Sequence, residues 1–340
     1  MPLPRVAVDA RGGDHGAAVV VQGAVLACRE LEVEVSLVGP EAELRRELAA
    51  FDVTGLPLEV VDAPEVVEMG EKVSRSIFKK RSSIQVALEH VRNGKADAFF
   101  SAGNTAVCWA IAKVVLGTLS EVDRPGLAAV FPNREGRTVL LDVGANAQCK
   151  ARNLEEFAVM GSVYSQGVFH ADSPRVGLMS LGEEETKGSD LTRDVHEVLR
   201  GSNLNFLGNV EGHDVFTGKV DVVVMDGFTG NVMLKACETL AEFMIELIRE
   251  ELMSSVRTRV GAWLSQPAFR EVRRRSDPAE IGGAPLLGMK GCCVIGHGKS
   301  SARAVMHGIR TAAEFFASGV NDSIEPELRS LGARKEAASA

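Results

Sequence analysis

The chain has 340 residues, of which 45% are hydrophobic and 25% are charged, so it can bury a large core as an ordinary globular protein does. Its formal net charge of −8 argues against broad nucleic-acid binding, which needs a basic face. No apolar run approaches the roughly 18 residues of a membrane-spanning helix, and no signal peptide precedes the first strand pattern. We therefore expect a soluble, cytoplasmic protein.

The opening of the chain alternates between strand and helix patterns. The segments 5–10, 33–39 and 58–63 are rich in β-branched residues, and helical patterns separate them over 17–31 and 41–50. A β-α-β-α-β opening is typical of a parallel sheet with helices on both faces.

The same alternation continues without a linker that would divide the chain. Helices are predicted over 84–91, 154–169, 191–199 and 302–318, and strands over 96–100, 127–131, 138–143, 175–181 and at the start of 205–216, with a final strand or hairpin within 281–300. We expect one three-layer α/β/α domain with a mostly parallel sheet over 1–332, followed by a flexible tail over 333–340.

Five strand patterns end in a polar, glycine-containing turn that leads directly into a helix pattern. We call these turns corners, and they lie within 6–16, 97–107, 138–150, 176–188 and 221–235. A strand, a tight turn and a helix start bring unpaired N–H groups and the positive end of a helix dipole together, which suits an anion. Because ligands of open α/β sheets bind outside the carboxyl ends of strands, we expect the corners to line one cleft at that edge.

The residue types at the corners suit an oxyanion such as phosphate. The motifs GxSxG, Walker A and HExxH are absent, and GGDHG at 12–16 does not match GxGxxG. A single Asp-Gly corner is more often turn chemistry than a site, and His15 and His297 are as well explained by local hydrogen bonds as by function. The predicted phosphate ligands are the backbone N–H groups of Asn104, Asn146 and Asn231, the charge of Lys187 or Lys150, and the hydroxyl groups of Thr105, Thr229 or Ser300.

The six cysteines show neither a CxxC pair nor the spacing of a metal site. Four lie within apolar strand or helix patterns, where a free cysteine behaves as a small hydrophobic residue. The count indicates a reducing cytoplasm rather than a disulfide framework, and we expect neither a metal ion nor a cofactor.

The region from about 240 to 280 is predicted to be a helical excursion from the domain. An apolar residue recurs at every fourth position from Met244 to Leu264, which is typical of a core or dimer contact. Between Leu252 and Ser276 six arginines accompany one acidic residue, Glu271, in a chain that is otherwise acidic. This reversal of charge favours a docking surface over an ordinary solvated face.

Eight motifs follow one another along nearly the whole chain: DARGGDHG (9–16), SAGNT (101–105), LLDVGAN (140–146), FAVMGSVY (157–164), LGEEETKG (181–188), NFLGNVEG (205–212), DGFTGNVMLK (226–235) and GGAPLLGMKG (282–291). Each is weak alone, but the ordered set closely resembles the phosphate acyltransferase family of bacterial phospholipid synthesis (phosphate:acyl-[acyl-carrier-protein] acyltransferase, PlsX). Two positions depart from the family pattern: Arg11 stands where a Met is expected, and Ala106 stands where SAGNT is usually followed by Gly.

The resemblance implies reversible transfer of a fatty acyl group from acyl-[acyl-carrier-protein] to inorganic phosphate, which gives acyl phosphate and free carrier protein. The acyl phosphate then feeds a membrane glycerol-3-phosphate acyltransferase. The resemblance also implies a fold similar to the isocitrate and isopropylmalate dehydrogenases and a homodimer. From composition and the segment at about 240–280, we expect a cytoplasmic protein in peripheral contact with the membrane.

The residues that match the family motifs carry the expected roles. The expected catalytic residues are Lys187, Asn231, His15 and Asp226, with proton transfer by His15, Asp9 or Asp226. The expected phosphate- and substrate-binding residues are Gly12, Gly13, Asp14, Ser101, Gly103, Asn104, Thr105, Gly144, Asn146, Lys150, Glu184, Thr186, Gly227, Thr229, Gly230 and His297. Outside the motifs, the basic charge and apolar character of the segment at about 240–280 give the expected contacts to the acidic carrier protein or to an anionic membrane: Arg257, Arg259, Trp263, Arg273, Arg274 and Arg275.

Three alternatives stay open at this stage. One is a phosphate acyltransferase that uses acyl-CoA, such as a phosphate acetyltransferase. Another is a nicotinamide-dependent decarboxylating dehydrogenase on the related fold, although no clear metal-binding carboxylate cluster or cofactor loop supports it. The last is a non-catalytic scaffold that binds acyl carrier protein or membrane through 240–275, which would leave the polar corners without a purpose.

Overall fold

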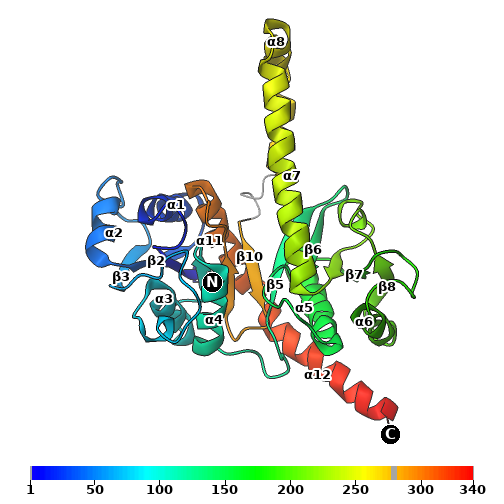
Figure 1. Ribbon diagram of the computed structural model, residues 1–340. Helices are drawn as coiled ribbons and strands as arrows, with labels where there is room; N and C mark the ends of the chain where they lie inside the picture. Colours follow the sequence, from blue (N-terminus) through cyan, green and yellow to red (C-terminus); the bar gives the residue numbers. More distant parts are fainter. Residues whose placement is uncertain (1, 277–281, 340) are drawn as a thin grey trace.

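An eleven-stranded sheet runs through the part of the chain that the computed structural model describes, residues 2–276 and 282–339 (Figure 1). Its strands stand in the order β3-β2-β1-β4-β11-β10-β5-β6-β9-β7-β8. The strands are β1 (Arg5–Asp9), β2 (Glu34–Gly39), β3 (Leu58–Asp62), β4 (Ala98–Ser101), β5 (Gly126–Pro132), β6 (Arg137–Leu141), β7 (Arg175–Met179), β8 (Asn205–Val210), β9 (Val222–Val224), β10 (Ala284–Leu287) and β11 (Cys292–Ile295).

Helices pack on both faces of this sheet. Successive side chains of a strand point to opposite faces, and Val8 and Phe100 accordingly join one buried apolar cluster while Ala7 and Phe99 join a second. The expected three-layer α/β/α architecture is therefore confirmed. The helices are α1 (Ala17–Glu30), α2 (Glu41–Leu48), α3 (Ser83–Arg92), α4 (Thr105–Val115), α5 (Ala151–Phe169), α6 (Asp190–Arg200), α7 (Gly227–Met253), α8 (Val256–Leu264), α9 (Gln266–Ser276), α11 (Ala302–Ala317) and α12 (Val320–Ser339), with short 3-10 helices η1 (Ile77–Lys79) and η2 (Asp214–Phe216).

The strands form two parallel blocks that run in opposite directions. The first block is β3-β2-β1-β4-β11 and the second is β6-β9-β7-β8. Between them, β10 is antiparallel to β11 and to β5, and β5 is antiparallel to β6, which reverses the direction of the second block. The carboxyl ends of the two blocks therefore lie at opposite edges of the sheet, and the expectation of five corners along one edge is wrong.

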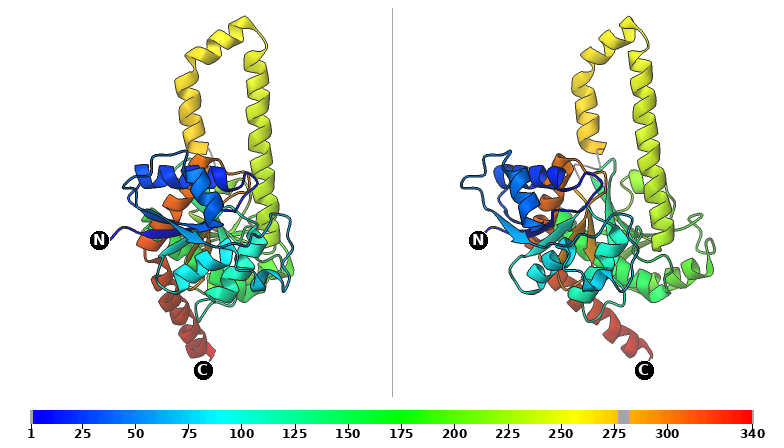
Figure 2. Two further views of the ribbon diagram at one scale, coloured as in Figure 1. Left: turned by 90° about the vertical axis from the view of Figure 1, so that its left-hand side faces the viewer. Right: turned by 60° about the vertical axis from the view of Figure 1, so that its left-hand side comes forward.

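Helices α7, α8 and α9 form an arm that projects from the body (Figures 1 and 2). Helix α7 begins against the sheet and leaves it, α8 forms the tip, and α9 runs back toward the body (Figure 2). The excursion thus begins earlier than 240. The single stripe expected from Met244 to Leu264 is interrupted because a new helix starts after Ser255, whose hydroxyl oxygen accepts from the backbone N–H of Thr258.

The end of the chain is a helix in the structure, since α12 extends to Ser339. The division into a domain over 1–332 and a flexible tail over 333–340 stays a prediction. Within the described residues, none of the helices combines the length and the apolar character that crossing a membrane requires.

Candidate functional site

Loops that follow β1, β3, β4 and β11 meet at the carboxyl edge of the first block, and we call them the first corner group. The backbone N–H of Asp14 donates to the carbonyl oxygen of Gly298 at 2.8 Å. The Asn104 side chain donates to the carbonyl oxygen of Met69 at 2.7 Å, and its oxygen accepts from the first turn of α4. The Asn104 side chain therefore serves as a helix cap and a loop clamp. The role of the Asn104 backbone N–H as a phosphate donor stays a prediction.

A buried carboxylate lies beneath these loops. Asp9 accepts a hydrogen bond from the hydroxyl of Ser101 at 2.6 Å, and Ser101 in turn accepts from the backbone N–H of Gly103. Burial raises the pKa of Asp9, and hydrogen bonds from Ser101 and Ser83 oppose this. A Cβ atom at Gly12 would lie 2.7 Å from the Gly103 nitrogen, so only glycine lets the two loops approach this closely.

A second corner group lies at the carboxyl edge of the second block, where β6 and β9 end. Its centre is Asp142, which is fully buried and accepts from the backbone N–H groups of Leu127, Gly144, Ala145 and Asn146 and from the Asn146 side chain. Burial raises the pKa of Asp142, and these donors oppose the shift. Because the Asn146 N–H is bound by this carboxylate at 2.7 Å, it is not the phosphate donor that the sequence suggested.

Helix α7 begins in the same group, and its first-turn donors are also satisfied. Asp226 caps the helix, accepting from the N–H groups of Phe228 and Thr229 and from the Thr229 hydroxyl. The N–H of Gly227 donates to the carbonyl oxygen of Asn146, and Asn231 lies past the first turn, where N–H groups bond within the helix. The backbone at the start of α7 is therefore not free to bind an anion, contrary to expectation.

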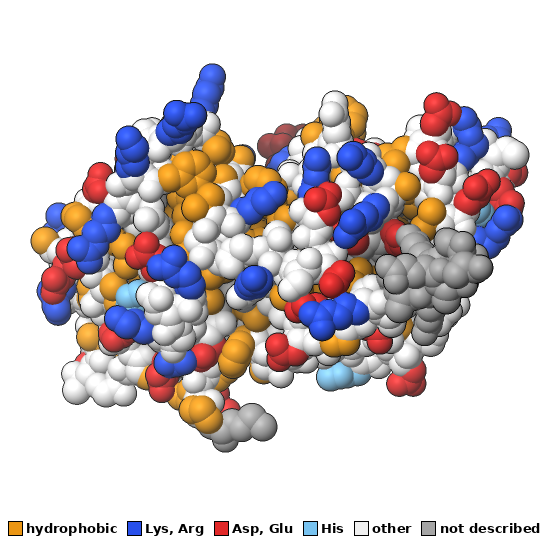
Figure 3. All heavy atoms as spheres, turned by 90° about the horizontal axis from the view of Figure 1, so that it is seen from below, with side chains coloured by type: hydrophobic (Ala, Val, Ile, Leu, Met, Phe, Trp, Pro, Cys, Tyr) orange, Lys and Arg blue, Asp and Glu red, His pale blue; other side chains and the backbone are white. Residues whose placement is uncertain are grey.

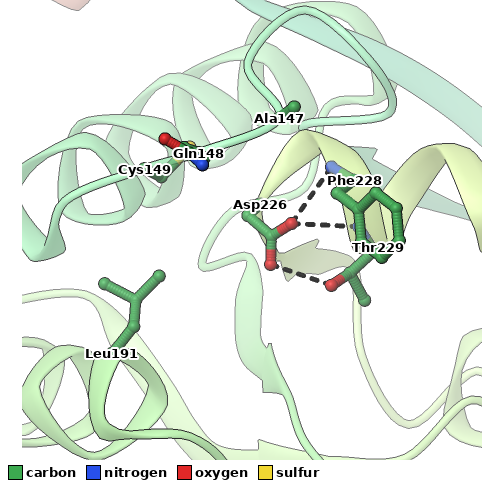
Figure 4. A pocket seen from close by; sticks show the side chains of 7 residues that line it. All are labelled: Ala147, Gln148, Cys149, Leu191, Asp226, Phe228 and Thr229. Carbon is green, nitrogen blue, oxygen red and sulfur yellow. Dashed lines mark hydrogen bonds between the residues drawn. The ribbon is translucent and has the colours of Figure 1, made fainter.

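An open hollow of about 450 Å³ lies in front of the α7 start (Figure 4). It is lined by Ala147, Gln148, Cys149, Leu191, Asp226, Phe228 and Thr229. Figure 4 shows Cys149 and Leu191 on the side of the hollow across from Asp226.

Three consecutive residues of this lining have unused backbone donors. Among the described residues, none accepts a hydrogen bond from the N–H groups of Ala147, Gln148 or Cys149. Successive backbone N–H groups in a turn form a concave site for anions. The residues that line the hollow thus include three whose backbone donors are unpaired within the described ranges, the Asp226 carboxylate and the Thr229 hydroxyl that donates to it, and the apolar side chains of Leu191 and Phe228.

The loop between β7 and α6 approaches the hollow from the other side. It leads into Leu191, and its backbone is fixed by hydrogen bonds from the Lys187 N–H and the Asn209 side chain to the carbonyl oxygen of Glu184. The side chains of Thr186 and Lys187 are exposed, and within the described part of the chain no carboxylate pairs with the Lys187 ammonium group. Lys187 is therefore available to a ligand.

The remaining predicted residues divide between the two groups. Gly12, Gly13, Asp14, His15, Ser101, Gly103, Asn104, Thr105 and His297 belong to the first corner group. Gly144, Asn146, Lys150, Glu184, Thr186, Lys187, Asp226, Gly227, Thr229, Gly230 and Asn231 belong to the second corner group or its neighbouring loops. No hydrogen bond between described residues joins the two groups.

Two glycines of the second group allow the start of α7 to lie close to the loop that follows β6. A Cβ atom at Gly144 would lie 3.5 Å from the side-chain oxygen of Asn231, and one at Gly230 would lie 1.9 Å from the carbonyl oxygen of Asp142. Lys150 caps α5 directly after the hollow-lining segment, and its own N–H donates to Asn153. The His297 ring accepts from the Lys299 N–H in the first group, which is a local hydrogen bond.

None of the cysteines is activated as a nucleophile. All six are free, and burial raises the pKa of each thiol, to about 11 for Cys149 in the hollow and to about 12 for Cys108. A thiol with such a pKa stays protonated near pH 7 and is a poor nucleophile.

The predicted contacts of the arm lie far from the hollow. Arg257, Arg259 and Trp263 are exposed in α8 at the tip, where the Trp263 side chain is 71% exposed. Helix α7 has 27 residues, so at the rise of an α-helix the tip stands about 40 Å from the start of α7. Arg273, Arg274 and Arg275 lie in α9, and their side chains fall outside the described residues.

The face opposite the arm has a mixed charge. Figure 3 shows Lys and Arg side chains interspersed with Asp and Glu among the coloured side chains of this view. The expectation that the protein does not bind nucleic acid broadly stays a prediction.

Sequence reasoning missed the residues that give the hollow its character: Ala147, Gln148, Cys149, Leu191 and Phe228. Their positions do carry a signal. The segment 147–149 separates a strand corner from the next helix, so its backbone belongs to neither element. Phe228 is a large apolar residue in a polar corner, and its side chain is 65% exposed.

Comparison with known proteins agrees with the motifs. A model of the family described as "Fatty acid synthesis protein" matches residues 4–323. The chain is 50% identical over 328 residues to the phosphate acyltransferase of Acidobacterium capsulatum, which covers 96% of this chain and 97% of that one. It is 42% identical over 328 residues to the phosphate acyltransferase of Aquifex aeolicus, with coverage of 96% and 97%.

Solved structures share the fold at low identity. A phosphotransacetylase from Streptococcus pyogenes superposes with a TM-score of 0.65 at 18% identity, covering 93% of this chain and 96% of that one. A 4-hydroxythreonine-4-phosphate dehydrogenase from Klebsiella pneumoniae superposes with a TM-score of 0.54 at 13% identity, covering 92% and 97%. The dehydrogenase-like fold is therefore confirmed. With the sequence matches, this means that the chain belongs to the phosphate acyltransferase family and is a transferase.

Proposed function

We propose that the protein transfers a fatty acyl group reversibly from acyl-[acyl-carrier-protein] to inorganic phosphate, giving acyl phosphate for phospholipid synthesis. The observation that carries the proposal is the hollow in the second corner group, where three consecutive backbone N–H groups have no acceptor among the described residues. A phosphate bound there would meet donors that need no reorganisation during the reaction.

Lys187 and Asn231 complete the phosphate site in this proposal. The Lys187 ammonium group is exposed without a carboxylate partner among the described residues, so it can balance the charge of phosphate. The Asn231 side chain lies beside Gly144, at the junction of the two loops of the second corner group. The acyl thioester would enter against Leu191 and Phe228, which give the hollow its apolar wall.

We assign a direct attack of phosphate on the thioester. A phosphate oxygen bonds to the carbonyl carbon and its proton passes to Asp226. The carbon–sulfur bond breaks, the leaving sulfur takes that proton, and the carrier protein leaves as its free thiol. No covalent intermediate is needed, in agreement with the raised pKa of every cysteine thiol. Asp226 lines the hollow whereas His15 lies in the first corner group, so we assign proton transfer to Asp226.

The arm supports two further assignments. Helix α7 exposes a run of apolar side chains that includes Leu240, Phe243 and Leu247, and we propose that it packs against a second copy in a homodimer. The tip places exposed Val256, Val260 and Trp263 beside Arg257 and Arg259, and we propose that it rests peripherally on an anionic membrane. Acyl phosphate released there could pass to a membrane glycerol-3-phosphate acyltransferase.

The function is tested by incubating the purified protein with phosphate and with acyl carrier protein that bears a long-chain acyl group. We expect a phosphate-dependent product that hydroxylamine traps as hydroxamate, together with release of free carrier protein. Acyl-CoA in place of the carrier protein distinguishes the rival substrate, since equal kcat/KM for both donors would contradict carrier-protein specificity. No product from a folded protein that still binds the carrier protein would support the scaffold instead.

A further inference from the structure

The segment between β3 and α3 carries a basic surface that the proposed site does not use. Over 68–81 it has five Lys and Arg residues and two acidic residues, in a chain whose formal charge is −8. Lys72, Arg75 and Lys79 are exposed, and no ion pair between described residues involves any of them. Their charge is therefore available to a partner in solution.

The segment is held in a fixed shape despite its lack of long helices or strands. Val67 and Ile77 are buried in the core, and the Lys80 ammonium group bridges the Glu71 carboxylate at 2.8 Å and the carbonyl oxygen of Val66 at 3.1 Å. The pairing of Lys80 removes it and Glu71 from the surface charge, which leaves four exposed cations without an ion pair among the described residues: Lys72, Arg75, Lys79 and Arg81. A preorganised surface loses less entropy on binding than a mobile loop does.

The same surface also offers an apolar contact. Val73 lies between Lys72 and Arg75 in sequence, and its side chain is 48% exposed. Glu68 is an exposed acidic residue at the start of the segment, so the positive field is concentrated over 72–79. An apolar side chain among cations suits a protein partner with acidic residues around an apolar contact.

The position of the segment links it to the corners. Met69 accepts a hydrogen bond from Asn104, and its side chain lies beside Gly298, so the segment borders the first corner group.

We propose that Lys72, Arg75 and Lys79, with Val73 between them, form the docking surface for the acidic acyl carrier protein. The inference rests on the proposed function, because it concerns the donor of that reaction. The surface acts on the encounter of the two proteins rather than on the chemistry, so it should set the KM for the carrier-protein donor and its dependence on salt.

The test is the double reversal Lys72→Glu/Arg75→Glu, assayed with acyl-[acyl-carrier-protein] and with an acyl-pantetheine thioester that lacks the protein. We expect KM for the carrier-protein donor to rise about tenfold and to lose most of its salt dependence. The kcat/KM for acyl-pantetheine should stay within about twofold, which also shows that the variant is folded. Adding Lys79→Glu should raise the KM further.

The matched control is Arg92→Glu/Lys95→Glu. Both residues are exposed and precede β4, so they lie at the opposite edge of the first block, away from the corners. An equal rise in KM for this control would show a general effect of net charge and would overturn the proposal. A rise confined to Arg257→Glu/Arg259→Glu would overturn it as well, by placing the carrier protein at the tip.

Different results would contradict the proposed function and the docking surface. If the wild-type protein makes no acyl phosphate from acyl-[acyl-carrier-protein], the proposed function fails. If the wild-type protein makes it and the Lys72→Glu/Arg75→Glu variant keeps the wild-type KM, only the docking surface fails. Loss of binding to anionic vesicles in this variant, with an unchanged KM for the carrier protein, would assign the surface to a membrane instead.

Discussion

The two corner groups are built from the same sequence pattern, yet they leave different backbone donors free. In the first group the loops bind one another, with Asn104 clamping Met69 and Asp14 bonded to Gly298. In the second group Asp142 and Asp226 satisfy the donors nearest to them and leave those of 147–149 without an acceptor among the described residues.

This difference shows that a strand–glycine–helix corner does not by itself make an anion site. A capping carboxylate or amide uses some of the first donors of a helix. In the second group the donors left without an acceptor in the described part of the chain belong to 147–149, between β6 and α5. The first of these donors in the second group is the N–H of Ala147, one residue past Asn146, whose N–H was the predicted phosphate donor.

The largest effect is expected at Gly230, where α7 contacts the β6 corner. A Cβ atom there would lie 1.9 Å from the carbonyl oxygen of Asp142, so Gly230→Ala must displace the helix from the corner. We expect a loss of about 3 kcal/mol in the free energy of unfolding, measured by urea denaturation. The control Gly261→Ala, in the exposed helix α8 with open space around it, should gain up to about 1 kcal/mol; equal stability of both variants would contradict the packing.

Replacing the candidate proton-transfer residues shows directly which corner group carries out proton transfer. Asp226→Asn keeps a side chain that can cap α7 but removes the base, so kcat should fall about a hundredfold. His15→Ala, in the first corner group, should change kcat less than about threefold. Steady-state rates of hydroxamate formation measure both, and the reverse order of effects would move the proton transfer to the first group.

The phosphate ligands should show a smaller loss. Lys187→Ala and Asn231→Ala are each expected to lower kcat/KM for phosphate at least about tenfold, because each removes a polar contact to a charged ligand. Lys95→Ala, an exposed cation of the first block, serves as the control. Wild-type rates in both site variants would exclude these assignments.

The smallest effect is expected at Cys149, although it lines the hollow. Direct attack by phosphate predicts that Cys149→Ser keeps kcat within about twofold, whereas an acyl-enzyme on this thiol would lose its nucleophile. Because burial raises the thiol pKa to about 11, its reaction with iodoacetamide should accelerate by about tenfold per pH unit from pH 7 toward that value. Fast alkylation at pH 7 would disagree with a protonated thiol.

Much of the fold follows from periodicity and order. The β-α-β-α-β opening, the hairpin of β10 and β11, and the helices on both faces are confirmed because strand runs and amphipathic helices leave local patterns. The reversed direction of the second block could not be predicted from the sequence. It depends on β10 pairing with β5, whose residues lie more than 150 positions apart, and such pairing leaves no local signal.

Some residues of the candidate site could likewise be predicted from the sequence, and others could not. Asp226, Lys187 and Asn231 could be named because they stand in recognisable corners. The free donors of 147–149 could not be named, since they depend on which carboxylate takes the Asn146 N–H. The hollow itself is a property of three segments brought together by tertiary structure, and Leu191 and Phe228 belong to it for that reason.

The most direct test of the account concerns the free donors of the hollow. Gln148→Pro removes one backbone N–H, whereas Gln148→Ala changes the side chain and keeps it. Hydroxamate assays over a range of phosphate concentrations give KM for phosphate in each variant. The account predicts a rise of about tenfold or more for the proline variant and less than about twofold for the alanine variant. The same KM for phosphate in both folded variants would contradict a phosphate site at 147–149.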